Sequence, residues 1–330
     1  MSRAKLRFLS GADVRRALPM AQAVEVMAKA FADLSSGQVT VPPRIHMALA
    51  EASGDALFMP SYNPAQEHMG VKIVTLFERN RDTHLPFIQA LVVVLDATNG
   101  SPIGVMDGAS ITAIRTGAAS GAATEALARR DASVAAIFGA GMQGRTQLEA
   151  VCAVRRIGQA RVFDVDTAAA EAFAQEMGRS LGVPVEVAAD ATAALAGADV
   201  VCTATTADTP VFDDADICPG VHINAVGSYK PDVREIPAQT VVRARVVVDQ
   251  DEVALEEAGD LIMPMRAGLI RRDHVTTELG SVVAGMAPGR QDDSEITLFK
   301  SVGVAVQDLA AAGKVLKNAE AMGLGTELEL

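Results

Sequence analysis

The spacing of hydrophobic positions divides the chain into a helical start, a strand-rich segment and a long alternating part. From Val14 to Phe31 apolar side chains recur at helical spacing, which predicts two short helices within residues 11–35. Ser10 is suited to cap the first of these helices, and Pro19 is suited to open the second.

Residues 41–107 show short β-rich runs with no helical segments between them, among them DALFMP, GVKIVTLF and FIQALVVVLDA. The dipeptide Asn99-Gly100 favours a tight hairpin turn between two of these runs. Consecutive strands of this kind predict an antiparallel or mixed sheet. After Gly108, the small residues of SITAIRTGAASGAATEALARRD predict a helix that leaves this first domain.

From residue 133 onward, apolar runs alternate with helical stretches. The runs are SVAAIFGA, ARVFDV, VEVAAD, DVVCTAT, VHINAVG and ARVVVD. Strands joined by helical crossovers predict a parallel, doubly wound sheet. Near the end, EITLFKSVG predicts a short strand, and the residues after it a long amphipathic helix that returns to the first domain. We therefore predict an α/β fold with a smaller α+β domain (residues 1–117 and 300–330) and a doubly wound domain (residues 118–299).

Composition and charge narrow the choice of partners. The 330 residues include 29 basic and 41 acidic residues, a net charge of −12, so the field of the protein repels phosphate backbones and anionic lipid surfaces. We expect neither nucleic acid nor a membrane as a partner. The three cysteines form no CxxC pair, and the sequence has neither a signal-like start nor a run of about 18 apolar residues. These features predict a cytoplasmic protein.

The stretch GAGMQG lies directly after the run SVAAIF and directly before a helical segment. Glycines at this spacing allow a tight turn, a close approach of the backbone to a pyrophosphate, and close packing of helix against strand, as in a Rossmann dinucleotide site. The residues expected at the dinucleotide here are Gly139, Ala140, Gly141, Met142, Gln143 and Gly144.

Asp164 bears on which dinucleotide binds. It ends the next strand, 25 residues beyond Gly139, where a carboxylate accepts hydrogen bonds from an adenosine ribose. A carboxylate at this point repels a 2′-phosphate, so NAD(H) is favoured over NADP(H). NADP(H) stays open as an alternative, in which Asp164 is a solvated loop residue and the cofactor is selected elsewhere.

The ends of two later strands are the other candidates for cofactor contacts. Ligands of doubly wound sheets bind at the carboxyl ends of the strands, so these segments are expected to line the ribose and the nicotinamide. Ordinary turn chemistry at a strand end is the alternative. The candidates are Thr203, Ala204, Thr205, Asn224, Val226, Gly227 and Ser228.

The segments VPPRI, MGVKIVTLF, ASITAIRTGAASGAAT, FGAGMQG, GVHINAVGS and EITLFKSVG occur in an order that resembles the ornithine cyclodeaminase/mu-crystallin family. The resemblance extends from about residue 10 to about residue 320. It implies a two-domain NAD(P)-dependent enzyme that acts at the α-carbon of amino or imino acids. It also implies a homodimer formed through the N-terminal domain, which would bind the substrate as well.

Within this resemblance, Arg44, Lys72 and Arg115 match positions that hold the substrate carboxylate and assist proton transfer, and Thr116 lies beside them at the cofactor. A guanidinium can grip one carboxylate at two points, and a lysine screened from water can have its ammonium pKa lowered enough to exchange protons. We therefore expect Lys72 to be the proton donor, and the three cations to face the nicotinamide ring.

Two positions depart from the cyclodeaminase members. Tyr229 stands where those enzymes carry a catalytic aspartate, and Leu57 stands where they carry a glutamate. Expelling ammonia requires such a base, and a phenol with a pKa of about 10 is a poor replacement. The segment VGSYKPDVREI instead looks like that of family members that reduce cyclic ketimines.

The prediction is therefore NAD(P)H-dependent reduction of Δ1-pyrroline-2-carboxylate to proline and of Δ1-piperideine-2-carboxylate to pipecolate. The alternatives are an ornithine cyclodeaminase, an alanine dehydrogenase-type enzyme, and a non-enzymatic binding protein of the mu-crystallin kind. The histidines show no metal-binding spacing: His222 is expected in the core and His84 in a solvated loop. Cys202 is expected to be a buried, inert thiol.

Overall fold

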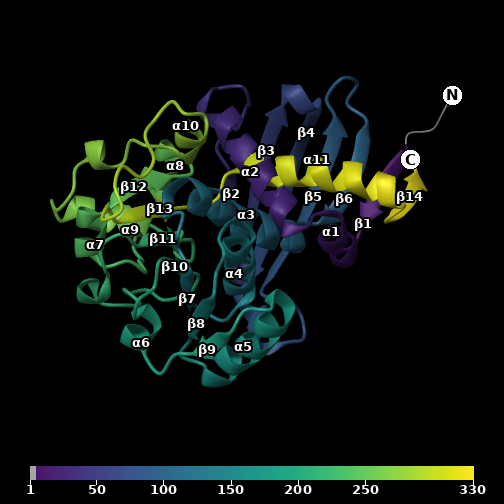
Figure 1. Cartoon of the computed structure of the whole chain (residues 1–330). Coiled ribbons are helices and arrows are strands. Elements are labelled where there is room, and N and C mark those ends of the chain that lie inside the picture. Colours follow the sequence, from purple (N-terminus) through teal and green to yellow (C-terminus); the bar gives the residue numbers. More distant parts are fainter. Residues whose placement is uncertain (1–4) are drawn as a thin grey trace. The chain divides into compact units, whose positions relative to one another are not determined.

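The computed structural model describes residues 5–330, without the side chain at position 81. The chain forms two compact units. Unit 1 comprises the residues up to Arg115 together with Val304–Leu330, and unit 2 comprises Thr116–Gly303. The helices and strands of both are labelled in Figure 1.

Unit 1 is built on a mixed sheet of seven strands in the order β14-β1-β6-β5-β4-β3-β2. Its neighbours are antiparallel except for β1 and β6, which run parallel. Short 3₁₀ helices lie at Ala50–Ala52, Pro64–Gln66 and Glu78–Asp82. The longer elements are β1 (Lys5–Leu9), α1 (Gly11–Ala17), α2 (Met20–Ser35), β2 (Ile45–Leu49), β3 (Gly54–Asn63), β4 (His68–Phe77), β5 (Ile88–Asp96), β6 (Pro102–Asp107), the start of α3 (Gly108–Leu127), α11 (Ala305–Met322) and β14 (Thr326–Glu329).

The two predicted N-terminal helices are confirmed, with their predicted ends. Ser10 caps α1 in a capping box with Asp13, and Pro19 is the N-cap residue of α2. The edge strands β1 and β14 were not predicted. They pair with each other in antiparallel fashion, with Lys5 opposite Glu329 and Arg7 opposite Glu327, and the Arg7 guanidinium lies 2.5 Å from the Glu327 carboxylate.

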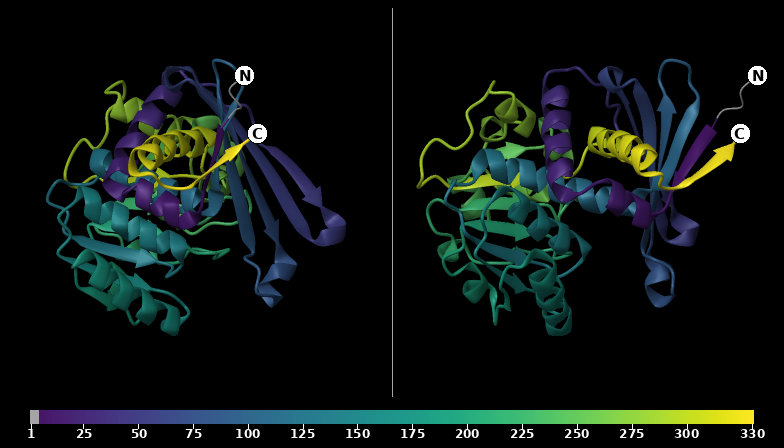
Figure 2. Two further views of the ribbon diagram at one scale, coloured as in Figure 1. Left: turned by 90° about the vertical axis from the view of Figure 1, so that its right-hand side faces the viewer. Right: turned by 45° about the vertical axis from the view of Figure 1, so that its right-hand side comes forward.

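Helix α11 covers one face of the sheet of unit 1. It packs on β3, β4 and β5 and also contacts α1 and α2, as the yellow helix beside the blue strands shows (Figure 2). The C-terminal segment therefore completes the unit that the N-terminal segment begins, because the sheet needs this helix to bury its inner face.

Unit 2 is built on seven parallel strands in the order β12-β13-β11-β10-β7-β8-β9. The predicted parallel, doubly wound sheet is confirmed, and with it the α/β fold class. Short 3₁₀ helices lie at Asp214–Asp216 and Arg272–His274. The longer elements are β7 (Val134–Phe138), α4 (Met142–Val154), β8 (Gln159–Phe163), α5 (Thr167–Leu181), β9 (Val185–Val187), α6 (Ala191–Leu195), β10 (Val200–Thr203), β11 (His222–Ala225), α7 (Ala238–Arg243), β12 (Arg245–Val248), α8 (Asp251–Glu257), α9 (Gly259–Arg266), α10 (Leu279–Val283) and β13 (Thr297–Lys300).

Successive residues of the strands of unit 2 supply two hydrophobic clusters, one on each face of the sheet. In β7, Ala135 and Ile137 belong to one cluster, and Ala136 and Phe138 belong to the other. The strand order reverses between β7 and β10, so ligands are expected at the carboxyl ends of these two strands. The sequence predicted a short strand at β13 but did not place it between β11 and β12.

In the described part of the chain, no helix combines the length and the apolar character needed to cross a bilayer.

Candidate functional site

Lys72, Arg115 and Asp308 form a buried ionic cluster in unit 1. The Lys72 ammonium lies 2.8 Å from one carboxylate oxygen of Asp308, and Arg115 Nε lies 3.1 Å from the other. Arg115 Nη1 donates to Gln307 Oε1 at 3.0 Å, and the same oxygen accepts the backbone N–H of Val304 at 2.9 Å. The carboxylate therefore bridges the two cations and fixes the direction of both.

The sheet register explains why the Lys72 ammonium is buried. Lys72 on β4 lies between Met59 on β3 and Val92 on β5, and both of these neighbours are buried. Side chains in one cross-strand row point to the same face of a sheet. That face is the one that α11 covers, and Asp308 lies in the first turn of this helix.

The environment lowers the pKa of Lys72 to about 8. Burial is the main cause, because it removes the ammonium from water. The positive charges of Arg115 and Arg44 lower the pKa further, whereas the Asp308 carboxylate raises it. Arg44, half-buried just before β2, is thus close enough to act on Lys72. The three cations that the sequence singled out lie in one cluster, which we call the cationic centre.

Sequence reasoning missed Asp308 and Gln307. A signal was present, because QD interrupts the apolar run VAVQDLAAAG in the first turn of a helix whose N-terminal half is buried. A buried carboxylate requires partners. The sequence did not show that these partners are Lys72 on β4 and Arg115, which lies 193 residues away along the chain.

Removing the Asp308 charge should move the pH profile of activity. If the Lys72 ammonium donates a proton, kcat/KM falls as pH rises through about 8, because the neutral amine has no proton to give. Asp308→Asn removes the charge that raises this pKa, so the falling limb should move to lower pH by about 1 unit or more.

The control for this pH profile is Asp33→Asn, which changes a buried carboxylate of unit 1 that pairs with Lys29 instead. Its falling limb should coincide with that of the unmodified protein. An unmoved limb in Asp308→Asn would show that Lys72 is not the titrating group.

The predicted glycine loop joins β7 to α4 in unit 2. Gly139 has φ +100°, a conformation that favours glycine. A Cβ on Gly144 would lie 2.0 Å from the Gly139 carbonyl oxygen, whereas a Cβ on Gly141 would meet nothing within 4 Å. Gly144 therefore lets the helix approach the strand, and Gly141 leaves open space above the loop.

The remaining predicted loop residues differ in exposure. Ala140 is buried and Met142 is 62% exposed. The Gln143 carbonyl accepts the Thr146 hydroxyl within the first turn of α4. Thr116 is buried, and its carbonyl accepts Gln147 Nε2 of α4 at 3.3 Å.

Asp164 follows β8 and is tied to the glycine loop. One carboxylate oxygen accepts the backbone N–H of Ala140 at 2.7 Å, and the other accepts the N–H of Asp166 at 2.9 Å. The carboxylate is therefore held directly beside the glycine loop, where a 2′-hydroxyl or a 2′-phosphate of a dinucleotide is discriminated.

Buried Glu235 joins the predicted strand ends of β10 and β11. Its carboxylate accepts from the Thr203 hydroxyl at 3.0 Å, from both the N–H and the hydroxyl of Thr205 at 2.7 Å, and from the N–H groups of Gly227 and Ser228 at 2.8 and 3.1 Å. Ala204 and Val226 continue these two strand ends as half-buried residues. Sequence reasoning missed Glu235.

Asn224 is placed differently from the other strand-end candidates. It lies within β11, fully buried, and its amide nitrogen donates to the Thr124 hydroxyl at 3.0 Å. Its oxygen lies 3.1 Å from His222 Nε2. The Asn224 side chain therefore makes its hydrogen bonds to other buried side chains of unit 2. His222 is a core residue, as predicted, and burial lowers its pKa to about 3.

Two further reactive side chains are those of Cys202 and His84. Cys202 is buried, which raises the pKa of its thiol to about 12, so the thiolate is scarce at neutral pH. His84 is exposed in a loop. Among residues 5–330 as described, no cluster of His, Cys, Asp and Glu is suited to a metal ion.

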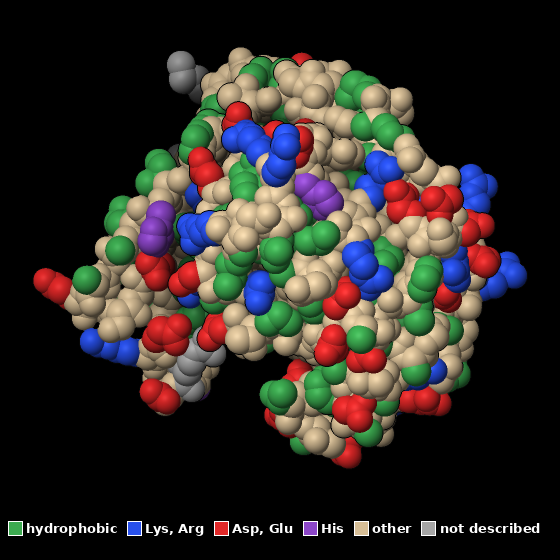
Figure 3. Space-filling view, turned by 90° about the vertical axis from the view of Figure 1, so that its left-hand side faces the viewer, with side chains coloured by type: hydrophobic (Ala, Val, Ile, Leu, Met, Phe, Trp, Pro, Cys, Tyr) green, Lys and Arg blue, Asp and Glu red, His purple; other side chains and the backbone are tan. Residues whose placement is uncertain are grey.

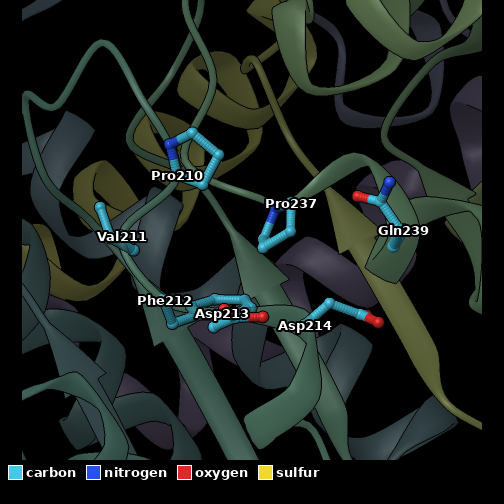
Figure 4. A pocket seen from close by; sticks show the side chains of 7 residues that line it. All are labelled: Pro210, Val211, Phe212, Asp213, Asp214, Pro237 and Gln239. Carbon is cyan, nitrogen blue, oxygen red and sulfur yellow. The ribbon is translucent and has the colours of Figure 1, made fainter.

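A surface pocket of unit 2 contains none of the predicted site residues. Figure 4 shows it beside the start of α7. It is lined by Pro210, Val211, Phe212, Asp213, Asp214, Pro237 and Gln239.

The parts of unit 2 fit a dinucleotide. The glycine loop leaves open space at Gly141, where the N-terminus of α4 favours a pyrophosphate. Asp164 offers a fixed carboxylate to a ribose. These features define a dinucleotide-binding α/β protein, which also carries the cluster of positive charge that we call the cationic centre in unit 1.

The chain belongs to the ornithine cyclodeaminase/mu-crystallin family, whose model matches residues 5–323. It is 38% identical over 322 residues to a Δ(1)-pyrroline-2-carboxylate reductase of Bacillus cereus, covering 97% of this chain and 99% of that protein.

Two solved structures have the same fold over nearly the whole chain. The Δ(1)-pyrroline-2-carboxylate reductase of Thermococcus litoralis, in complex with NADH and L-proline, aligns with a TM-score of 0.93 at 41% identity, covering 97% of this chain and 99% of that one. An archaeal alanine dehydrogenase dimer with bound NAD aligns with a TM-score of 0.92 at 32% identity, covering 99% of both chains. The resemblance inferred from the motifs is confirmed.

Proposed function

We propose that this protein reduces Δ1-pyrroline-2-carboxylate to L-proline with NADH, and that Δ1-piperideine-2-carboxylate is a second substrate of the same chemistry. The observation that carries the proposal is the cationic centre, in which buried Lys72, with its lowered pKa, shares the Asp308 carboxylate with Arg115 and is also affected by the charge of Arg44. The reductases of Bacillus cereus and Thermococcus litoralis support the choice of substrate.

The cationic centre suits a cyclic imino acid, whose one fixed anion is its carboxylate. The bonds to Asp308 and Gln307 use two N–H groups of Arg115, and a guanidinium has five. Arg115 therefore has a fixed orientation and further donors to offer. We assign the carboxylate of the substrate to Arg115 and Arg44, since their charges compensate an anion that leaves water.

Lys72 is assigned to the proton. When bound, NADH supplies the hydride that C2 of the imine accepts, and the ring nitrogen needs a proton to become the amine of proline. An ammonium with a pKa of about 8 is mostly protonated at neutral pH and releases its proton readily. Asp308 stabilises the protonated form and holds Nζ in place.

The dinucleotide is assigned to unit 2. The glycine loop from Gly139 to Gly144 would hold the pyrophosphate, and Asp164 the adenosine ribose. The ends of β10 and β11 would hold the nicotinamide half. This division makes unit 1 the substrate-binding unit and unit 2 the dinucleotide-binding unit.

The two positions that distinguish cyclodeaminases favour reduction. Tyr229 is 43% exposed in the segment after β11, and Leu57 is a half-buried residue of β3. Neither side chain can act as the carboxylate base that ammonia expulsion needs. We therefore favour the reductase over the cyclodeaminase.

The test of the proposed function is a panel of initial rates with purified protein. The panel contains Δ1-pyrroline-2-carboxylate, Δ1-piperideine-2-carboxylate, pyruvate with ammonia, and ornithine, each with both cofactors. We expect NADH consumption with the ketimines, at the highest rate with the five-membered ring. Ammonia release from ornithine, or reduction of pyruvate with ammonia alone, would replace this proposal by one of the alternatives. Dinucleotide binding with no turnover would indicate a binding protein.

Asp164→Asn should relax the cofactor preference. The amide keeps an oxygen for the N–H of Ala140 but removes the charge that repels a 2′-phosphate. We expect the ratio of kcat/KM for NADPH to that for NADH to rise by about 10-fold or more. Asp166→Asn is the control, because it changes a carboxylate two residues away that caps α5, and Asn caps equally well. A preference of the unmodified protein for NADPH would refute the role of Asp164.

We also propose a homodimer formed through the outer face of the unit 1 sheet. In the row Ile45, Phe58, Ile73 and Leu91, each residue is opposite the next on the neighbouring strand. Ile73 follows Lys72, so this row points away from α11. Ile45 is 60% exposed and Leu91 46%, and an apolar sheet face of this kind is typical of an interface. The dimer of the archaeal alanine dehydrogenase supports the proposal.

A charge in this row should weaken the dimer. We expect Leu91→Asp to raise the dimer dissociation constant by about 10²-fold or more, because an unpaired charge in an interface costs several kcal/mol. Light scattering over a dilution series measures the change. Leu269→Asp introduces the same charge at a 48% exposed leucine of unit 2 and should leave the dimer intact. A dimer that survives in Leu91→Asp uses another surface.

The charged surface does not suggest a polyanionic partner. On the face shown in Figure 3, the described Lys and Arg side chains are interspersed with Asp and Glu. The described cysteines Cys152, Cys202 and Cys218 are free thiols, which accords with the proposed reducing, cytoplasmic setting.

A further inference from the structure

Three charged side chains lie buried together beneath the carboxyl ends of β10 and β11. They are Glu235, Asp260 in α9 and Lys300 at the end of β13, and each is 0% exposed. The Lys300 ammonium lies 2.8 Å from the Asp260 carboxylate. We call these three residues the buried triad. It lies outside the glycine loop and outside the cationic centre.

The triad satisfies the polar groups of both strand ends. One oxygen of Glu235 accepts two hydrogen bonds from Thr205, and the other accepts the Thr203 hydroxyl and the N–H groups of Gly227 and Ser228. Glu235 thereby links the end of β10 to the end of β11. Three of these contacts are backbone N–H groups, which can only donate, and together they reach both oxygens of Glu235, so both oxygens act as acceptors.

Asp260 and Lys300 hold Glu235 and Ser228 in turn. One oxygen of Asp260 accepts the N–H groups of Glu235 and Ile236 at 2.7 and 2.9 Å, and the other accepts the Ser228 hydroxyl. Lys300 donates to the carbonyl and to the hydroxyl of Ser228 at 2.5 and 3.0 Å. Asp260 and Lys300 therefore hold both the backbone carbonyl and the hydroxyl of Ser228 in place.

Gly227 and Gly139 show how closely the backbone packs against Glu235 and against the end of β10. A Cβ on Gly227 would lie 2.5 Å from both oxygens of Glu235, and a Cβ on Gly139 would lie 2.5 Å from the carbonyl oxygen of Ala204. The glycine loop thus abuts the end of β10 that Glu235 holds. Glu235 therefore fixes the strand ends that continue the dinucleotide site beyond the glycine loop.

The sheet order tells which half of a dinucleotide these strand ends meet. The order reverses between β7 and β10, and Asp164 places the adenosine half on the side of β7 and β8. The ends of β10 and β11 lie on the other side, which is that of the nicotinamide half.

We propose that Glu235, Asp260 and Lys300 are positioning residues for the nicotinamide half of the cofactor. They touch neither substrate nor reacting atoms, but they hold the Thr203–Thr205 and Gly227–Ser228 segments in the shape that receives the nicotinamide and its ribose. The inference rests on the proposed dinucleotide binding and does not depend on the identity of the substrate.

The test compares two ligands that share the adenosine and pyrophosphate groups. NADH carries the nicotinamide, and ADP-ribose lacks it. Calorimetry with Glu235→Gln, which places an amide NH₂ against N–H donors, should show NADH affinity reduced by about 10-fold or more, about 1.4 kcal/mol. ADP-ribose affinity should stay within about 2-fold of that of the unmodified protein, because the glycine loop and Asp164 are unchanged.

Two further variants complete the design. Ser228→Ala removes the hydroxyl that Asp260 and Lys300 share and should weaken NADH binding in the same selective way, by a smaller factor. Asp249→Asn is the matched control. It alters another fully buried carboxylate of unit 2, at the end of β12, that accepts from Ser301, Val302 and Gly303. Its ratio of NADH to ADP-ribose affinity should equal that of the unmodified protein.

Each outcome decides the proposal. A selective loss of NADH affinity supports it. Equal losses for both ligands, or no loss for either, overturn it, since the triad would then support only the fold or neither half of the site. If Glu235→Gln does not fold, the ratio in Ser228→Ala decides. The assay involves no turnover, so failure of the ketimine reaction would leave its result intact.

Discussion

Lys72→Met is expected to lower kcat for ketimine reduction by about 10²-fold or more, the usual contribution of a positioned general acid. Methionine fills a similar volume in the row between Met59 and Val92 but has no proton to give. The Asp308 carboxylate keeps Arg115 as a partner, so the fold of unit 1 should survive, as thermal unfolding would verify. Steady-state kinetics below pH 8 measures the effect.

The control for this prediction makes the same substitution at a surface position. Lys29→Met removes an ion pair with Asp33 in which the lysine side chain is 64% exposed, and Lys29 lies on α2, outside the cationic centre. Its kcat and KM should match those of the unmodified protein. If Lys72→Met raises KM and leaves kcat within about 3-fold, Lys72 serves to bind the carboxylate, and the proton comes from another group or from water.

Gly144→Ala is expected to weaken NADH binding by about 10²-fold or more and to lower the melting temperature as well. The added Cβ would lie 2.0 Å from the carbonyl oxygen of Gly139, a backbone atom that cannot rotate away. The start of α4 must then move from β7, which distorts the loop where the pyrophosphate meets the helix N-terminus. Calorimetric titration with NADH and a thermal melt measure the two effects.

Two other glycines separate folding from binding. Gly141→Ala has open space for its Cβ, so the melting temperature should hold while NADH binding weakens, because the methyl group occupies the space that a pyrophosphate requires. Gly158→Ala, whose nearest atom would be the Ser133 carbonyl oxygen at 3.9 Å, should change neither. Unchanged NADH affinity in both Gly144→Ala and Gly141→Ala would show that the dinucleotide does not bind at this loop.

Local patterns determined most of the elements. Ser10 and Pro19 set the starts of α1 and α2 because caps act within one turn. The parallel sheet of unit 2 followed from apolar runs separated by helical stretches, since such strands pair only through crossovers. The edge strands β1 and β14 were not predicted because they are only five and four residues long and nearly all of their residues are exposed or half-buried, so no buried face marks them.

The motifs likewise determined the cationic residues and the glycine loop. The resemblance to the family singled out Arg44, Lys72 and Arg115 as candidates to bind one anion, and the spacing of the glycines singled out Gly139 to Gly144 as a turn for a phosphate. The glycine prediction rests on residue types at short spacings, which a sequence shows without the fold.

The tertiary structure alone decided the partners of the buried charges. Asp308 reaches Lys72 and Arg115 only because α11 returns to the unit 1 sheet. Glu235, Asp260 and Lys300 meet only because β13 inserts beside β11. No local pattern specifies such pairs. A buried charge pairs with the opposite charge or hydrogen-bond donor that the packing brings within about 3 Å. Because packing depends on the whole chain, a short stretch of sequence does not reveal the partner.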